Sequence, residues 1–384
     1  MPRRRNLRPA LALALAAILI AAIPAADAAA RSVPQGFYGV MWDRAVAEAP
    51  AAEQEAQWAL MARSGVESVR TVFLWSSAQP EAGKAPDFAA TDLLVGLAAR
   101  HNIKLLPIVR STPVWAARGR YEHGSPPRRI SDYTAYLKAL VGRYGPRGSF
   151  WREHPGVPRR PQREWQIWNE PHLQFYWATR GRGRNAWIAE YAKLLRASKK
   201  TIDSVDPGAT IVLAGLADFA WTHLDRLNRL GIRRHFDVAS LNLFTARPKL
   251  AVKGVLLFRR ALRRGGEARK PVWLTETTWP AAKNRVPAPD VAWQRQWYTT
   301  DSGMAKRLSG LYSVAASKRR RLRLGRVYWY TWASAYDDGD LFDYAGLNSF
   351  SNGVSKPRRA LTAYAASARE HEGCRKTEAG VCAR

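Results

Sequence analysis

The chain has 384 residues, of which 47% are hydrophobic and 24% are charged. These values are ordinary for a globular protein and exclude wholesale disorder and a collagen-like repeat. The formal net charge is +30, the chain holds 16 tryptophans, and its two cysteines, Cys374 and Cys382, are too few for a disulfide scaffold or a four-cysteine zinc site.

The N-terminal segment predicts export. An arginine-rich start precedes an uncharged apolar run over Ala10–Ile23, and Ala26-Asp27-Ala28 gives a small-x-small cleavage pattern. We interpret residues 1–28 as a secretory signal peptide, because the run is shorter than the roughly 20 residues that a membrane span needs. An uncleaved anchor is the alternative. Export would allow a structural disulfide between Cys374 and Cys382, and we expect no transmembrane span after cleavage.

Short apolar runs alternate with longer amphipathic stretches through residues 29–384. The runs predict strands at Phe37–Trp42, Val69–Trp75, Ile103–Val109, Trp165–Trp168, Thr210–Ala214, Phe236–Phe244, Val272–Thr275 and Val327–Thr331. The stretches predict helices at Ala51–Arg63, Thr91–His101, Ser131–Tyr144, Trp187–Val205, Trp221–Leu230, Val252–Arg264, Val291–Leu311 and Lys356–Arg369.

Eight strand–helix units predict a parallel sheet with helical crossovers, and their number favours a closed (β/α)8 TIM barrel over an open sheet. No Gly-, Ser- or Pro-rich linker divides residues 29–384, so we interpret them as a single domain. The segments Ser111–Ile130 and Pro146–Arg163 are predicted to be irregular insertions. In such a barrel, reactive groups belong at the C-terminal ends of the strands.

The positive charge indicates partners only loosely. Its clusters at Arg259-Arg260 and Arg263-Arg264 lie on a predicted helix, and Lys318–Arg321 is predicted to lie in the connection before the last strand. No nucleic-acid-binding motif accompanies them, so we expect no specific nucleic-acid partner. A solvated surface, attraction to an anionic cell-envelope polymer or acidic polysaccharide, and compositional bias toward arginine all remain open.

Two predicted strand ends carry acids. The fourth strand ends in Trp168-Asn169-Glu170-Pro171, and the seventh runs into Leu274-Thr275-Glu276. One such glutamate alone is as easily a helix cap or an ion-pair partner. Two on the same face of a predicted barrel, flanked by tryptophans, favour a chemical role over a structural one.

Together these motifs resemble those of the clan A retaining glycoside hydrolases, with family 39 and the cellulase-like members nearest in appearance. The segment Thr112-Pro113-Val114-Trp115 supports this resemblance. It implies a glycosidase in which Glu170 is the acid/base and Glu276 the nucleophile. With the predicted signal peptide, we expect this enzyme to be secreted.

The resemblance also implies roles for neighbouring residues. Arg70 would keep Glu276 ionised, and Asn169 would donate to the 2-hydroxyl of the sugar. Asn242 belongs to the same predicted substrate-binding group, on the sixth strand. Trp332 would form the floor of the subsite for the reacting sugar, and further aromatic platforms are expected at Trp42, Trp115 and Trp279. The mechanism needs no cofactor, and the sequence contains no obvious metal-ligand cluster.

One position departs from the clan pattern. Many members have a tyrosine at strand six that hydrogen-bonds the nucleophile, whereas this chain reads Asn242-Leu243-Phe244. Phe244 cannot donate a hydrogen bond, so Tyr330, Tyr336 or another group must replace it, or the nucleophile is tuned differently. Two functions stay open: a retaining glycosidase acting on a β-linked glycoside or polysaccharide, and a non-catalytic carbohydrate-binding barrel at the cell envelope.

Overall fold

The computed structural model describes residues 31–119, 124–179, 181–287, 294–337 and 340–372. The predicted signal peptide and both cysteines lie outside these residues, so those interpretations stay predictions.

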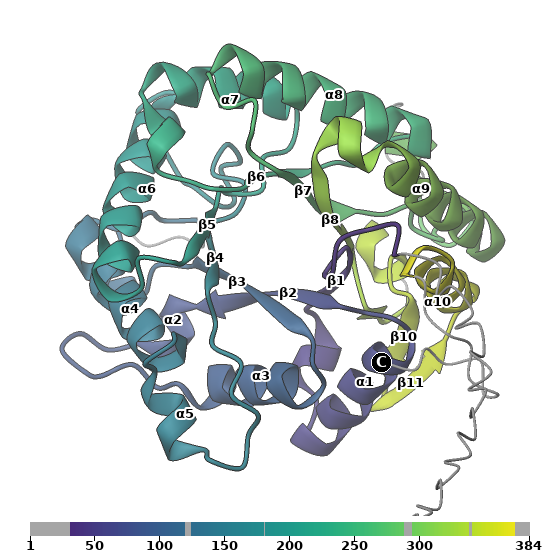
Figure 1. The fold of residues 1–384 in the computed structure, drawn as a ribbon, viewed down its shortest axis with the longest axis horizontal. Helices are drawn as coiled ribbons and strands as arrows, with labels where there is room; N and C mark the ends of the chain where they lie inside the picture. Colours follow the sequence, from purple (N-terminus) through teal and green to yellow (C-terminus); the bar gives the residue numbers. More distant parts are fainter. Residues whose placement is uncertain (1–30, 120–123, 180, 288–293, 338–339, 373–384) are drawn as a thin grey trace, which may run out of the picture.

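Eight parallel strands form the central sheet, in the order β5-β4-β3-β2-β1-β8-β7-β6. Their bounds are β1 Tyr38–Trp42, β2 Ser68–Leu74, β3 Lys104–Arg110, β4 Glu164–Ile167, β5 Thr210–Val212, β6 Ala239–Asn242, β7 Val272–Thr277 and β8 Leu324–Trp329. Isolated parallel bridges from Val212 to Val238 and from Leu216 to Leu241 connect the two edge strands. The sheet is therefore a closed ring, as the alternation of the sequence predicted (Figure 1).

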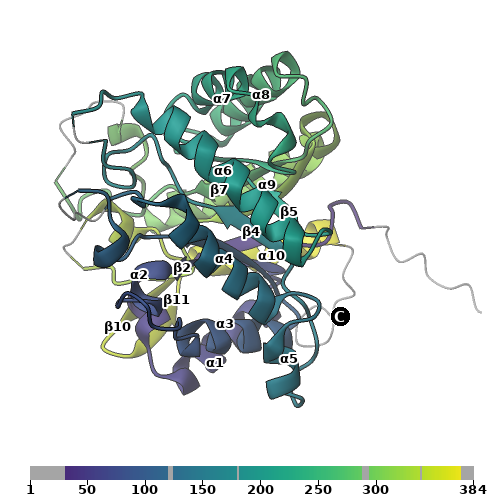
Figure 2. The same ribbon diagram turned by 90° about the vertical axis from the view of Figure 1, so that its left-hand side faces the viewer.

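Helices surround this ring. Their bounds are α1 Ala51–Arg63, α2 Trp75–Ala78, α3 Ala89–Arg100, α4 Ile130–Tyr144, α5 Ser149–Glu153, α6 Ala186–Val205, α7 Ala220–Arg229, α8 Pro248–Arg264, α9 Asp301–Leu322 and α10 Arg359–Glu372. Short 3₁₀ turns lie between them at η1 Ala45–Glu48, η2 Val114–Ala116, η3 Ile232–Arg234, η4 Gln294–Gln296 and η5 Leu341–Tyr344. Figure 2 shows α4 and α6 side by side on the outside of the barrel, where their buried faces pack.

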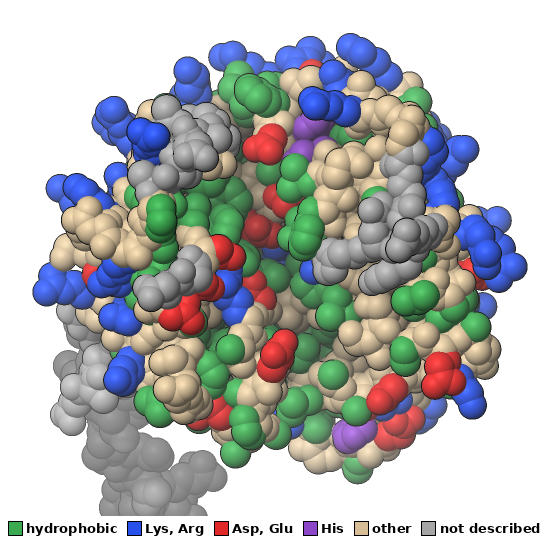
Figure 3. Space-filling model, turned by 180° about the vertical axis from the view of Figure 1, so that it is seen from behind, with side chains coloured by type: hydrophobic (Ala, Val, Ile, Leu, Met, Phe, Trp, Pro, Cys, Tyr) green, Lys and Arg blue, Asp and Glu red, His purple; other side chains and the backbone are tan. Residues whose placement is uncertain are grey.

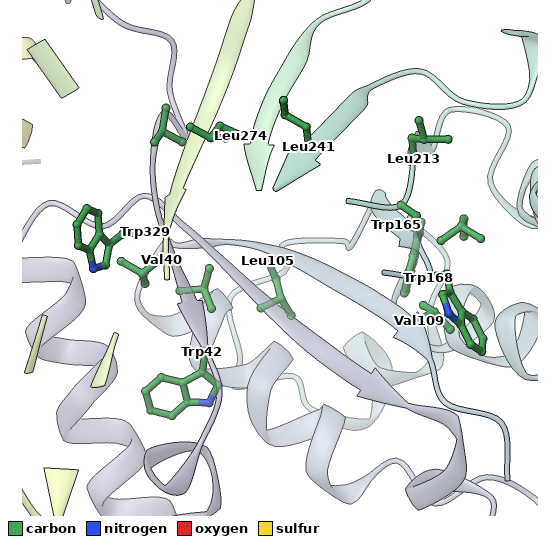
Figure 4. Packing of buried hydrophobic residues seen from close by; sticks show 14 of the residues in the cluster. Val40, Trp42, Leu105, Val109, Trp165, Trp168, Leu213, Leu241, Leu274 and Trp329 are labelled. Carbon is green, nitrogen blue, oxygen red and sulfur yellow. The ribbon is translucent and has the colours of Figure 1, made fainter. Parts of the chain in front are cut away.

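The core has two layers because side chains alternate along each strand. Leu105 and Val109 of β3 belong to the large cluster between strands and helices (Figure 4). Leu106 points the other way and joins residues from other sides of the ring in a second cluster inside the barrel. The members of that inner cluster are Leu106, Val212, Val238, Trp273 and Tyr328.

Three local predictions need correction. Helix α9 begins at Asp301, where the Thr300 side chain caps it by accepting from the Gly303 N–H, and it continues to Leu322. Lys318–Arg321 is thus part of this helix rather than of a connection. A small sheet also follows the barrel, with β9 Ala333–Ser334, β10 Asn348–Ser351 and β11 Val354–Pro357, so α10 starts later than predicted. Strands of two to four residues are too short to show a hydrophobic period.

Candidate active site

The two predicted acids stand at the same end of the barrel. Glu170 is the third residue after the end of β4, and Glu276 is the fifth residue of the six-residue strand β7. Both are largely buried, with exposures of 7% and 8%. Figure 3 shows this face of the molecule, with a hollow near its centre where acidic side chains gather, while lysines and arginines lie mainly around the periphery.

Glu276 is paired with Arg70, as the sequence predicted. The Nη1 of Arg70 donates to Oε1 of Glu276 at 2.6 Å, and the arginine side chain is fully buried. Burial raises the pKa of Glu276, and the charge and hydrogen bond of Arg70 oppose that shift. No described residue donates a hydrogen bond to the second oxygen, Oε2. The ion pair therefore fixes the carboxylate and leaves one oxygen open.

Glu170 has a different environment. Its Oε1 accepts a hydrogen bond of 2.8 Å from Nδ2 of Asn242, a neutral donor. Burial, and next the negative charge of Glu276, raise the pKa of Glu170 to about 8. Of the two acids, Glu170 is thus the one that keeps its proton at neutral pH, since Glu276 has the cationic partner.

A continuous hydrogen-bonded chain joins the acids. Nη2 of Arg70 donates to Oδ1 of Asn169 at 2.8 Å, and Nδ2 of Asn242 reaches the same oxygen at 3.4 Å. Nε of Arg70 donates to Gln166 at 2.8 Å. These contacts leave the Nδ2 of Asn169 without an acceptor among the described residues, so it can donate to a substrate hydroxyl.

The backbone after β4 turns sharply to present these groups. Trp168 and Glu170 have φ values of 67° and 41°, in the left-handed region that side-chain-bearing residues rarely adopt. Opposite them, a Cβ on Gly215 would lie 2.6 Å from Oδ1 of Asn242 and 2.9 Å from Oδ1 of Asn169. Only glycine fits there, because the two amides pack against its backbone. Strained backbone of this kind concentrates at functional sites.

One polar residue that the sequence analysis left unassigned, Asp43, lies on this side of the site. Asp43 follows β1 and accepts hydrogen bonds from the hydroxyls of Thr331 and Tyr330. Burial raises the pKa of Asp43, and the hydrogen bond from Thr331 and the charge of Arg44 oppose the shift. Asp43 could have been found from the sequence, because it is a polar residue directly after a predicted strand.

Tyr330 and Tyr336 are the two candidates to replace the tyrosine that is missing at strand six, and the structure gives them different surroundings. Phe244 packs against Trp297 and Phe342, with ring centroids 5.4 and 5.5 Å apart. The Tyr336 hydroxyl donates to the backbone oxygen of Gly346 at 2.8 Å. Tyr330 is the one whose pKa is raised by the charges of Asp43 and Glu276, after the larger effect of burial. Of the two tyrosines considered, Tyr330 is therefore the one placed beside Glu276.

The aromatic platforms need a correction. Trp42, Trp279 and Trp332 have exposures of 0%, so no ring face is open to a sugar. Trp332 donates its Nε1 to Gln57 at 2.8 Å, and Trp42 packs edge-on against Trp58. Packing is the role the structure gives all three rings. All three tryptophans lie at or just after strand ends, as predicted. Whether such a side chain points into the cleft or into the core depends on tertiary packing, which the sequence does not show.

Trp115 keeps part of its surface exposed. It packs edge-on against Trp75 at 5.5 Å and donates its Nε1 to the backbone oxygen of Gln79 at 2.9 Å. It is the one predicted aromatic platform whose ring is still partly accessible.

The described residues contain no group of three or more His, Cys, Asp or Glu side chains placed to hold a metal ion. None of the helices in the described part of the chain has the length and hydropathy needed to cross a membrane.

No protein-family model and no curated protein matches this chain. Solved structures do. A family 39 glycoside hydrolase from Bacteroides cellulosilyticus WH2 superposes with a TM-score of 0.60 at 18% identity, over 89% of this chain and 64% of that one. A monomeric β-xylosidase from Caulobacter crescentus CB15 gives 0.61 at 15% identity, over 88% and 68%. An exo-β-1,4-mannosidase from Opitutaceae bacterium strain TAV5 gives 0.59 at 15% identity, over 88% and 59%.

These likenesses show the fold. This chain shares its (β/α)8 barrel fold with these three glycosidases, one of which is a family 39 glycoside hydrolase. The chain spans roughly two thirds or less of the length of these three structures.

Proposed function

We propose that the protein is a retaining glycosidase that hydrolyses a β-linked glycoside or polysaccharide, with Glu170 as acid/base and Glu276 as nucleophile. The observation that carries this proposal is that the two oxygens of each carboxyl group have different environments. One oxygen of each glutamate is held by a positioning donor, and no described residue bonds the other oxygen. The names of the structural neighbours, a β-xylosidase and an exo-β-1,4-mannosidase among them, support the same reaction class.

The reaction would proceed by double displacement. Glu170 gives its proton to the glycosidic oxygen while Oε2 of Glu276 attacks the anomeric carbon, and the aglycone leaves as an alcohol. Glu276 is then an ester and has lost its charge. Because that charge helps to raise the pKa of Glu170, its loss lowers the pKa. Glu170 can then take a proton from the water that hydrolyses the ester, which returns both groups to their starting states.

The carbohydrate-binding barrel is the weaker candidate. A buried ion pair such as Arg70–Glu276 would suit a binding protein as well as an enzyme. Binding alone, however, gives no reason to hold a second carboxyl protonated beside the first. We therefore favour catalysis, with the carbohydrate as substrate.

The test is hydrolysis of a panel of aryl β-glycosides by the wild type, combined with labelling by a 2-deoxy-2-fluoro aryl glycoside. We expect turnover of at least one glycoside and a covalent adduct on the peptide that contains Glu276, located by mass spectrometry. Failure of every glycoside to react, together with no adduct, would contradict the proposal and favour the binding barrel.

Secretion belongs to the same proposal. The arginine-rich start and the cleavage pattern at Ala26-Asp27-Ala28 support export, and the net charge of +30 supports retention at an anionic envelope polymer. Mass spectrometry of the protein recovered from its native host tests this. The expected N-terminus is residue 29, and an intact N-terminus in a membrane fraction would indicate an anchor instead.

A further inference from the structure

Arg110 is the last residue of β3 and has no role in the chemistry described above. On this strand Leu106 belongs to the cluster inside the barrel, and side chains two residues apart share a face. Arg110 therefore continues the inward-facing row of β3 at the end of the barrel where the two glutamates lie. Its partner in the sheet register is Leu74 of β2.

The guanidinium of Arg110 is held in place by its surroundings. Its Nη1 donates to the hydroxyl of Ser111 at 2.9 Å, and its Cζ lies 5.1 Å from the centroid of the Tyr176 ring. Stacking of this kind fixes the plane of the guanidinium and leaves its edge free to bind. No carboxylate of the described residues forms an ion pair with it.

Arg110 lies within electrostatic reach of the catalytic groups. Burial lowers its pKa, the charge of Arg70 lowers it further, and the charges of Glu276 and Glu170 raise it. At neutral pH Arg70 pairs with Glu276, Glu170 is protonated, and Arg44 pairs with Asp343. Arg110 is thus the cation beside the two glutamates that has no carboxylate partner among the described residues.

An unmatched cation at this place opposes the reaction of a neutral sugar. The transition state carries positive charge on the sugar ring, and a nearby guanidinium repels it. A negative group on the substrate removes the repulsion by pairing with the guanidinium. The planar fork of arginine is best matched by a carboxylate.

We propose that the substrate is an acidic glycoside, and that Arg110 binds a carboxylate carried by the sugar at or next to the reacting position. The proposal rests on the glycosidase function above and narrows it to uronides. The excess of basic residues over the whole chain favours acidic polysaccharides as the polymeric form of that substrate.

The experiment compares three aryl β-glycosides that differ at C6: glucoside, glucuronide and glucoside 6-sulfate. We expect kcat/KM for the glucuronide to exceed that for the glucoside at least 10-fold. In Arg110→Gln this ratio should fall by about 10- to 100-fold, the range for losing a charged hydrogen bond. The ratio for Arg110→Lys should lie between those of the wild type and Arg110→Gln, because lysine keeps the positive charge but cannot form two parallel hydrogen bonds to a carboxylate.

Arg129→Gln is the matched control, because it removes the same charge from an exposed position outside the cleft, and it should leave the ratio unchanged. A wild type that cleaves the glucoside as well as the glucuronide would overturn the proposal. So would an Arg110→Gln variant that lowers kcat/KM for both substrates equally. Preference for the 6-sulfate would overturn the assignment to a carboxylate.

Calorimetry separates this proposal from the glycosidase function. If no aryl glycoside is turned over, the glycosidase proposal fails, and binding still tests Arg110. Wild type should then bind an oligouronate at least 10-fold more tightly than a neutral oligosaccharide of the same length, and Arg110→Gln should lose that preference. Equal binding of the two oligosaccharides by the wild type would overturn the inference.

Discussion

The two ends of the barrel each bury an arginine, and the arginines are used in opposite ways. At the N-terminal end, Arg326 of β8 reaches across to Glu164 of β4 and bonds both of its oxygens, with Nη1 to Oε2 at 2.6 Å. The guanidinium also covers the Trp273 ring, 3.9 Å from its centroid. At the C-terminal end, Arg70 distributes its donors over Glu276, Asn169 and Gln166.

The difference lies in what each arrangement leaves free. The Arg326–Glu164 pair satisfies both carboxylate oxygens and closes the floor of the barrel. Arg70 satisfies one oxygen of Glu276, so the other can react. In (β/α)8 barrels the N-terminal face serves stability and the C-terminal face serves chemistry. Substitutions at the two ends should therefore separate stability from activity.

The largest effect is expected at Glu276, the proposed nucleophile. Glu276→Ala should lower kcat by about 10⁴-fold or more, because it removes the group proposed to form the covalent bond. Azide fits the space that the carboxylate leaves and should restore part of the turnover as a glycosyl azide, measured by release of the aryl group. Glu164→Ala is the matched control at the other end. Its kcat should stay within about threefold of the wild type, and a loss as large as that of Glu276→Ala would abolish the distinction between the ends.

The next effect is expected at Glu170. Glu170→Gln should lower kcat by about 10²- to 10⁴-fold on glycosides with poor leaving groups, the range for general acid catalysis. Because the acid must be protonated and its pKa is about 8, wild-type kcat/KM should fall as the pH rises through 8. The variant should lack this alkaline limb, since glutamine does not titrate. If Glu170→Gln showed the same fall in kcat/KM near pH 8, that fall would have to come from the titration of another group.

Stability gives the third contrast. Arg326→Met leaves Glu164 unpaired and should reduce the free energy of unfolding by about 3 kcal/mol, with activity per folded molecule unchanged. Urea unfolding measures the first quantity, and active-site titration with the fluorinated glycoside normalises the second. Adding Glu164→Leu should recover most of the stability, because the double variant has no unpaired charge. A variant that is both stable and inactive would mean that the floor takes part in catalysis.

The elements that the sequence predicted well are those with strong local signals. Apolar runs and amphipathic periods predicted the ring of strands and helices that brings Glu170, Glu276 and Arg70 together. The roles of these three residues came from the resemblance and stay proposals. The small sheet β9–β11 lacked any such signal. The tryptophan roles failed for Trp42, Trp279 and Trp332 because exposure depends on tertiary packing. Asp43 and Arg110 were visible as polar residues at strand ends, but only the structure shows which groups lie around them.

The smallest effect is expected at Asn242, which donates a hydrogen bond to Oε1 of Glu170 and thereby lowers the pKa of that acid. A donor favours the ionised form, so its removal should raise the pKa further. We expect Asn242→Leu to move the alkaline limb of kcat/KM upward by up to about one pH unit, because leucine also excludes the water that would replace the amide. Thr275→Val is the control, since the Thr275 hydroxyl donates to Oδ1 of Asn242 at 2.8 Å rather than to a carboxyl oxygen of either acid. Its limb should move less than that of Asn242→Leu. A limb that stays in place in Asn242→Leu would mean that the amide only positions Glu170, and that burial and Glu276 alone set its proton affinity.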